Sequence, residues 1–170
     1  MPELYMFSLG GNAGRSNIEV HDIQFVVADS VEAAIPHLQK VWFGDADKLH
    51  LDGYMRVRWV DGYDVVLGDK PCHSGLKLYF VNVGGYAPHT LAELHDFGLF
   101  VAEDAADAKR QALSTLLVGS VQQHKDNLKD VDNHLLLDKL QGYHIQLVKN
   151  PDGNADVPEW QGYRPIGRAR

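Results

Sequence analysis

Two stretches of the chain align without a gap: LYMFSLGGNAGRSNIEVHDIQFVVADSVEAA at residues 4–34 and LYFVNVGGYAPHTLAELHDFGLFVAEDAADA at residues 78–108. Eleven of the 31 aligned pairs are identical, whereas unrelated segments of this length would share about two by chance. The glycine and charged pairs among them are Gly10/Gly84, Gly11/Gly85, Glu19/Glu93, His21/His95 and Asp22/Asp96. The chain is therefore a tandem duplication of a module of about 70 residues.

Each copy has the pattern of two strands, one helix and a β-hairpin. Asp29-Ser30 and Asp104 are typical of helix N-termini, and Asp61-Gly62 and Gln141-Gly142 are placed as hairpin turns, of type I′ at Asp61-Gly62. The two glycine pairs are expected to end the first strand of each copy. The expected strands are 4–9, 23–28, 55–60 and 63–67, and 78–83, 97–102, 134–140 and 143–148. We therefore predict an α+β fold in which a ββαββ module occurs twice.

The repeat also sets the expected domain boundaries. We expect a first module at 1–67, a linker at 68–77, a second module at 78–149 and an extended C-terminal tail at 150–170, pinned by Trp160 and Tyr163. A domain this small buries only about 60% of its surface when isolated, so the two copies are expected to pack on each other. We predict pseudo-two-fold symmetry between them, as in a homodimer fused into one chain.

Composition excludes several classes of partner. The net charge is −7, and no run of lysine and arginine occurs in the body of the chain, so we expect no binding to nucleic acid. Cys72 is the only cysteine, which excludes an intrachain disulfide and favours the reducing cytoplasm. We expect no signal peptide, and the sequence holds no apolar run long enough to cross a membrane. We expect a cytoplasmic protein, either a monomer or a homodimer.

The order of Gly-Gly, His-Asp, an apolar strand and an alanine-rich helix, occurring twice, resembles a small bacterial family, domain of unknown function 1543. The resemblance is carried by Gly10-Gly11 with His21-Asp22 and by Gly84-Gly85 with His95-Asp96, and it covers residues 4–67 and 78–148. In that family the module occurs once or twice per chain. The resemblance implies no activity, substrate or catalytic residue, so it leaves function open.

The repeated polar and glycine residues are the candidate ligand-binding site, because a shared core already explains the apolar matches. A histidine can act as acid, base or metal ligand, and an aspartate can orient an imidazole. The alternative interpretation is structural: the histidine or aspartate fixes the loop, and the glycines adopt the positive φ of a turn. A phosphate loop is not expected, because the lysine and glycine spacing of such loops are absent. The candidates are Gly10, Gly11, His21, Asp22, Gly84, Gly85, His95 and Asp96.

No metal or cofactor is expected. His89, His95 and Asp96 could form a metal set in the second copy alone, but their spacing is weak support for three converging ligands. A further group of acidic and histidine residues lacks the calcium-loop pattern and is expected to be a solvated loop. That group consists of His124, Asp126, Asp130, Asp132 and His134.

Three hypotheses for function follow. The leading one is a non-enzymatic module that binds a small ligand or a protein near the Gly-Gly and His-Asp loops. The alternative is an enzyme of hydrolase or isomerase type that uses His21 and His95 as acid–base groups, oriented by Asp22 and Asp96. A third is an interaction protein whose surface, including the tail around Trp160, binds another protein. A structure in which His21 and His95 are buried, fully hydrogen-bonded and remote from any cleft would argue against the first two hypotheses.

Overall fold

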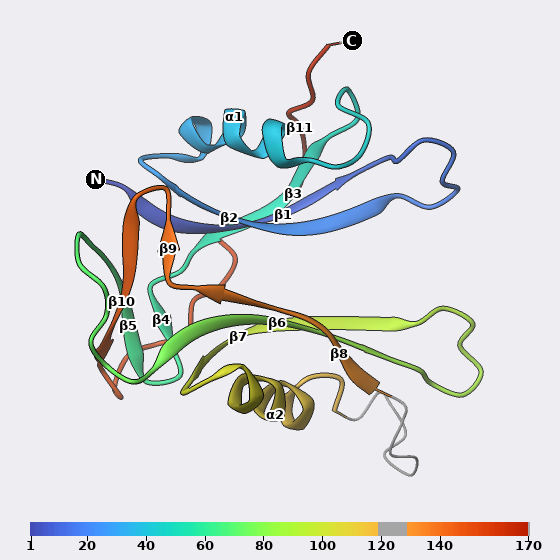
Figure 1. Cartoon of the computed structure of the whole chain (residues 1–170). Coiled ribbons are helices and arrows are strands. Elements are labelled where there is room, and N and C mark those ends of the chain that lie inside the picture. Colours follow the sequence, from blue (N-terminus) through green and yellow to red (C-terminus); the bar gives the residue numbers. More distant parts are fainter. Residues whose placement is uncertain (119–128, 170) are drawn as a thin grey trace. The chain divides into compact units, whose positions relative to one another are not determined.

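The structure is a computed structural model that describes residues 1–118 and 129–169, with residues 129–133 described by their backbone alone (Figure 1). The described residues form two helices and mostly antiparallel sheets, which confirms the α+β class. In chain order the elements are β1 (Glu3–Gly11), β2 (Val20–Ala28), α1 (Val31–Val41), β3 (His50–Arg56), β4 (Trp59–Val60), β5 (Tyr63–Gly68), β6 (Lys77–Gly85), β7 (Leu94–Ala102), α2 (Ala105–Thr115), β8 (Lys129–Leu137), β9 (Lys139–Leu140), β10 (Tyr143–Lys149) and β11 (Trp160–Pro165). Each copy thus places three strands after its helix, where we predicted two.

The chain folds into two compact units, and each unit contains residues of both sequence copies. The first unit contains Met1–Trp59, Leu140–Tyr143 and Asn154–Arg170, and the second contains Val60–Lys139 and His144–Gly153. The first unit therefore receives a hairpin turn from the second copy, together with the C-terminal segment.

The first unit is a four-stranded antiparallel sheet with one helix. Its strand order is β11-β3-β1-β2, and α1 packs against it. The side chain of Ser30 caps α1 by accepting a hydrogen bond from the N–H of Ala33, as the sequence predicted. Large apolar residues fill the core: Tyr5, Phe7, Leu9, Val26, Leu38, Trp42, Leu49 and Leu51 are among its buried members.

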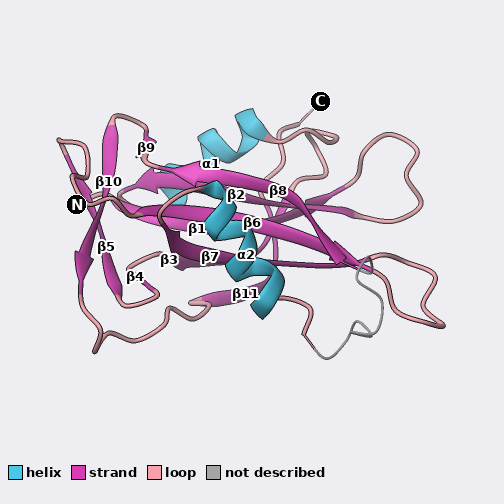
Figure 2. Ribbon diagram, turned by 60° about the horizontal axis from the view of Figure 1, so that its bottom comes forward, coloured by secondary structure: helices cyan, strands magenta, loops and turns pink. Residues whose placement is uncertain are grey.

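The second unit repeats this arrangement with one strand fewer among the described residues. Its sheet has the order β7-β6-β8, and α2 packs on all three strands (Figure 2). Asp104 caps α2 by accepting from the N–H of Asp107, again as predicted. Its core contains smaller residues: Tyr79, Val81, Val83, Phe100, Ala102, Ala108 and Ala112.

The glycine pairs are the last two residues of the first strands, whereas we predicted that they follow those strands. Strand β1 runs to Gly11 and β6 runs to Gly85, and all four glycines pair with the neighbouring strands. The described glycines with positive φ are Gly14, Gly62 and Gly142. Gly10, Gly84 and Gly85 pair with a strand on each side, and Gly11 pairs with Val20 on β2, so both glycine pairs belong to extended strands.

The two hairpin turns have the predicted backbone. Asp61 and Gly62 have φ of 50° and 91°, and Gln141 and Gly142 have 50° and 86°, which matches a type I′ turn. The long strands predicted before these turns were wrong, because their first halves pair elsewhere: β3 joins β1, and β8 joins β6. Only the short β4 and β9 remain beside the turns, in a small sheet of order β4-β5-β10-β9.

Each turn residue docks on a strand of the other copy. The Gln141 side chain accepts from the N–H of Val27 at 2.7 Å and donates to its carbonyl at 2.9 Å, so it replaces a neighbouring strand there. At the matching position, Asp61 accepts from the N–H of Val101 at 3.1 Å. The Val101 carbonyl is satisfied instead by Gln111, at 3.0 Å.

The C-terminal tail contains the regular strand β11, which pairs antiparallel with β3. Arg56 on β3 forms ion pairs with Glu3 and with Glu159, just before β11. Burial alone would raise the pKa of Glu3, but hydrogen bonds from Arg56 and Arg58 hold that pKa below its usual value. The tail is thereby fixed to the first unit by hydrogen bonds and charge. Among the described residues, no helix has the length and apolar character needed to cross a membrane.

Candidate functional site

Three residues on neighbouring strands of the first unit lie in one row. Gly10 on β1 is the Cα partner of His21 on β2 and of His50 on β3. Cross-strand partners point to the same face of an antiparallel sheet. The two histidine side chains therefore lie on one face of the sheet, with Gly10 between them.

Gly10 has no side chain because its neighbours occupy that space. A Cβ atom at Gly10 would lie 2.5 Å from Nε2 of His50 and 2.8 Å from Oδ2 of Asp52. Gly11 would point to the other face, where its Cβ would lie 2.8 Å from Cζ2 of Trp42. The glycine pair thus allows side chains to approach closely on both faces of the sheet. From the sequence, we had interpreted these glycines only as turn residues.

Asp52 reaches this row because β3 is irregular there. Leu51 pairs with Leu9 and Gly53 pairs with Ser8, so Asp52 between them has no partner on β1. Such an extra residue redirects a side chain, and bulges are frequent beside functional sites.

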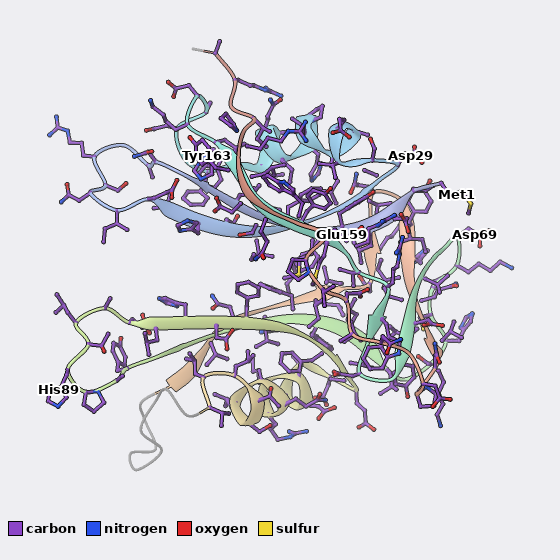
Figure 3. The ribbon with its side chains drawn as sticks, turned by 180° about the vertical axis from the view of Figure 1, so that it is seen from behind. Met1, Asp29, Asp69, His89, Glu159 and Tyr163 are labelled. Atoms are coloured by element: carbon purple, nitrogen blue, oxygen red, sulfur yellow. The ribbon has the colours of Figure 1, made fainter. Side chains whose placement is uncertain are left out.

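On its other side, β3 faces a matching irregularity in β11. Gly53 pairs with Gln161 and Leu51 pairs with Arg164, so Gly162 and Tyr163 lie opposite Asp52. The ring of Tyr163 lies 4.4 Å from that of His50, centroid to centroid. Tyr163 and Glu159 both come from the C-terminal segment (Figure 3).

Two carboxylates bridge the two histidines, and we name the four residues His21, His50, Glu19 and Asp52 the His21–His50 cluster. Nε2 of His50 lies 2.8 Å from Oε1 of Glu19 and 3.1 Å from Oδ1 of Asp52. Nε2 of His21 lies 3.4 Å and 3.5 Å from the second oxygens of the same two carboxylates. The side chain of His50 is 3% exposed and that of His21 is 57% exposed. The cluster therefore has a buried half and an accessible half.

Both ring nitrogens of His50 face acceptor oxygens, and two carboxylates set the formal charge of the cluster. Nδ1 of His50 lies 3.3 Å from the carbonyl oxygen of Lys48, which can only accept, so Nδ1 donates. Nε2 faces two carboxylates, which also only accept when ionised. Nε2 of His50 therefore lies among acceptor oxygens. The cluster holds two carboxylates and no lysine or arginine, so with its histidines counted as neutral its formal charge is negative.

The aspartates of the His-Asp dipeptides lie elsewhere. Oδ1 of Asp22 accepts from the N–H of Ile23 at 2.9 Å, and its Oδ2 accepts from the side chain of Gln24 at 2.8 Å. Oδ1 of Asp96 accepts from the N–H of Phe97, and its Oδ2 accepts from that of Leu117. Adjacent strand residues point to opposite faces. The carboxylates that contact His21 are therefore Glu19 and Asp52, in place of the expected Asp22.

The second copy has the same backbone positions with different residues. His95 lies 3.5 Å from Glu93, and its side chain is 56% exposed. In the β6–β8 register, Gly84 is the partner of Asp130, and Asp132 falls at the unpaired position between Val131 and Asn133. Asp130 thus stands at the register position of His50, and Asp132 at that of Asp52.

Two other predicted groups gain no support as metal sites. His89 lies in the loop between β6 and β7, at its outer tip in Figure 3. Asp130 to His134 belong to strand β8, so the prediction of a solvated loop was wrong there, while His124 and Asp126 lie outside the described residues. Across the described ranges, no group of three or more histidine, cysteine or acidic side chains is arranged to hold a metal ion.

Reasoning from the sequence missed His50, Asp52 and Tyr163. The repeat pointed to Glu19 as well as His21, because Glu19/Glu93 is an identical pair. It did not point to His50, because the aligned position of the second copy is an aspartate. The ligand-binding role of the eight candidate residues stays a prediction.

Comparisons with known proteins agree with the duplication. The family model described as Domain of Unknown Function (DUF1543) matches the chain twice, at residues 16–67 and 90–147. The crystal structure of the protein Il1583 from Idiomarina loihiensis is similar over 99% of this chain and 100% of that one, with a TM-score of 0.76 and 31% sequence identity. No curated protein matches the chain significantly. The chain therefore belongs to the DUF1543 family and carries its domain in two copies.

Proposed function

We propose that this protein is a non-enzymatic module that binds a small polar molecule at the His21–His50 cluster. One observation carries the proposal: His21 is 57% exposed although the carboxylates beside it are already fixed by the buried His50. A histidine kept only for stability is expected to be buried and satisfied, whereas a binding group is held in place and left accessible.

The way the cluster is positioned supports the same function. Gly10 leaves room for His50 and Asp52, and the irregularity in β3 turns Asp52 toward both histidines. These groups come from three paired strands, so little conformational entropy is lost when a ligand binds. The first repeat is therefore the proposed site.

The test is a titration of the full-length chain with three probes, observed by NMR. Protein labelled with ¹³C at histidine is titrated with methylguanidinium, inositol and citrate, which are a cation, a neutral polyol and an anion. His21→Asn identifies the His21 resonance. We expect at least one probe to shift that resonance saturably in the wild type and in the control Glu93→Gln, but not in Glu19→Gln. If none of the three does so, or if Glu19→Gln leaves the shift unchanged, the proposal is wrong.

An acid–base enzyme is the second candidate, because each carboxylate contacts the buried and the exposed histidine through different oxygens. Such bridging offers a route for protons between His50 and His21. Its carboxylates would be Glu19 and Asp52, since Asp22 bonds to Ile23 and Gln24. The same titration separates the candidates: new resonances of a probe accumulating with time would indicate turnover, and an unchanged probe spectrum would indicate binding.

The remaining expectations from the sequence stay predictions. They are the cytoplasmic location, the monomeric or homodimeric state, and the pseudo-two-fold packing of the two modules. The reducing compartment is supported by the presence of Cys72 as the only cysteine.

A further inference from the structure

We propose that the ligand of the His21–His50 cluster is an organic cation, an amine or a guanidine, bound between the carboxylates and the ring of Tyr163. This inference rests on the proposed function and names its ligand class. It is argued from charge, from the aromatic neighbour and from the difference between the two repeats.

The charge of the cluster favours a cation. The cluster contains two carboxylates, Glu19 and Asp52, and neither lysine nor arginine, so acidic groups dominate its formal charge. The oxygens that face His21 are Oε2 of Glu19 and Oδ2 of Asp52, and both donors and cations bind to such oxygens. An anionic ligand would have to approach two carboxylates at the accessible half of the cluster.

Tyr163 supplies an aromatic surface at the same place. Its ring contacts the buried ring of His50, and the residue is 69% exposed. The irregularity of β11 holds it there, and Gly162 beside it is required because a Cβ would lie 2.8 Å from Cζ2 of Trp160. An exposed aromatic ring next to carboxylates is the combination by which proteins bind organic cations.

The second repeat lacks this combination among the described residues. The sheet order there is β7-β6-β8, so no described strand occupies the place that β11 has beside β3. Among the described residues, the tyrosine beside the cluster therefore has no counterpart in the second repeat. We infer that cation binding is confined to the first repeat.

The experiment compares methylguanidinium with its neutral isostere N-methylurea, using full-length protein and the His21 resonance. We expect saturable binding of methylguanidinium and none of N-methylurea. Removing the ring in Tyr163→Leu should weaken binding about 2- to 30-fold, the range that corresponds to a cation–π contact. Tyr163→Phe keeps the ring and should bind like the wild type. Tyr86→Leu removes an exposed tyrosine of the second repeat and is the matched control.

The outcomes separate this inference from the proposed function. Equal binding of N-methylurea, or unchanged binding in Tyr163→Leu, would overturn the cation assignment. Binding of citrate but not methylguanidinium, lost in Glu19→Gln, would also overturn it and would leave the proposed function standing. If circular dichroism shows that Tyr163→Leu is unfolded, Tyr163→Phe and Glu19→Gln still decide. Loss of methylguanidinium binding in Tyr163→Phe, or unchanged binding in Glu19→Gln, contradicts the inference.

Discussion

The two repeats share a scaffold and differ at the strand that completes the site. In both, a Gly-Gly pair lies in the first long strand, and a histidine lies beside it on the second. The third strand brings His50 to that row in the first repeat and Asp130 in the second. Only the first repeat's third strand pairs with β11 among the described residues. A duplicated sheet can therefore retain the positions of a site while its chemistry diverges through one strand and one added neighbour.

Gly10→Ala should break the first repeat's site most severely. The new Cβ would lie 2.5 Å from Nε2 of His50, which is buried and bonded on both sides, so it cannot move without leaving polar groups unpaired. We expect a loss of about 2–5 kcal/mol in the free energy of unfolding, measured in urea. Gly75→Ala, where nothing lies within 4 Å of the added atom, is the control. A loss no greater than that of the control would contradict the assigned role of Gly10.

His50→Asp converts the first repeat's third strand toward the second repeat's residue. It removes the imidazole and places a third carboxylate beside Glu19 and Asp52. We expect a loss of about 1–3 kcal/mol at neutral pH. Stability should rise as the pH falls, because repelling carboxylates bind protons more readily in the folded state than in the unfolded state. His95→Asp, at a half-exposed histidine, is the control. The measurement is urea unfolding of His50→Asp at several pH values. A free energy of unfolding that does not change with pH would contradict the predicted repulsion between carboxylates.

Local patterns predicted the parts of this fold that depend on neighbouring residues. The helix caps at Ser30 and Asp104 and the turn at Asp61-Gly62 follow from side chains that bond within a few residues. The duplication was visible because identical residues recur at a fixed offset of 74. The apolar strands were also predicted from local patterns, although their first and last residues were not predicted correctly.

The site depends on pairing across the sheet, which no local pattern encodes. His50 and Asp52 lie about forty residues beyond Gly10, and only the register of β3 brings them to it. The extra residue in β3 shifts alternation, so Asp52 could not be assigned a face from the sequence. Gly162 and the irregularity of β11 likewise obscured the strand in the C-terminal tail. His21 was singled out, but its partners were sought next to it in the chain instead of across strands.

The attachment of the C-terminal segment should depend on acid pH. A hydrogen bond from Arg56 holds the pKa of Glu159 below its usual value, and the pKa of Glu3 is also lowered. A carboxyl whose pKa is depressed on folding contributes stability above its unfolded pKa, and this is lost as the pH falls through the folded pKa. Glu159→Gln should therefore lose up to about 1 kcal/mol at neutral pH and little at about pH 3. Thermal melts across this range test the difference, with Asp152→Asn as an exposed control; parallel profiles for Glu159→Gln and wild type would refute it.

The turn residues Gln141 and Asp61, which bond to strands of the other copy, give the prediction with the smallest expected effect. Gln141 satisfies both backbone groups of Val27, whereas Val101 needs two residues, Asp61 for its N–H and Gln111 for its carbonyl. Gln111→Ala should therefore lose about 0.5–1.5 kcal/mol by leaving the carbonyl unpaired.

Asp61→Gln gives the second unit the residue that the first unit uses at this place. Its amide can accept from the N–H of Val101 and donate to the carbonyl, as Gln141 does at Val27. In wild type, where Gln111 already bonds the carbonyl, we expect a change within about 0.5 kcal/mol; in the Gln111→Ala background it should restore most of the loss. A double-mutant cycle in urea measures this coupling. Additive effects would mean that the turn residue is chosen for its backbone conformation alone, and that the repeats do not differ in how they satisfy this strand.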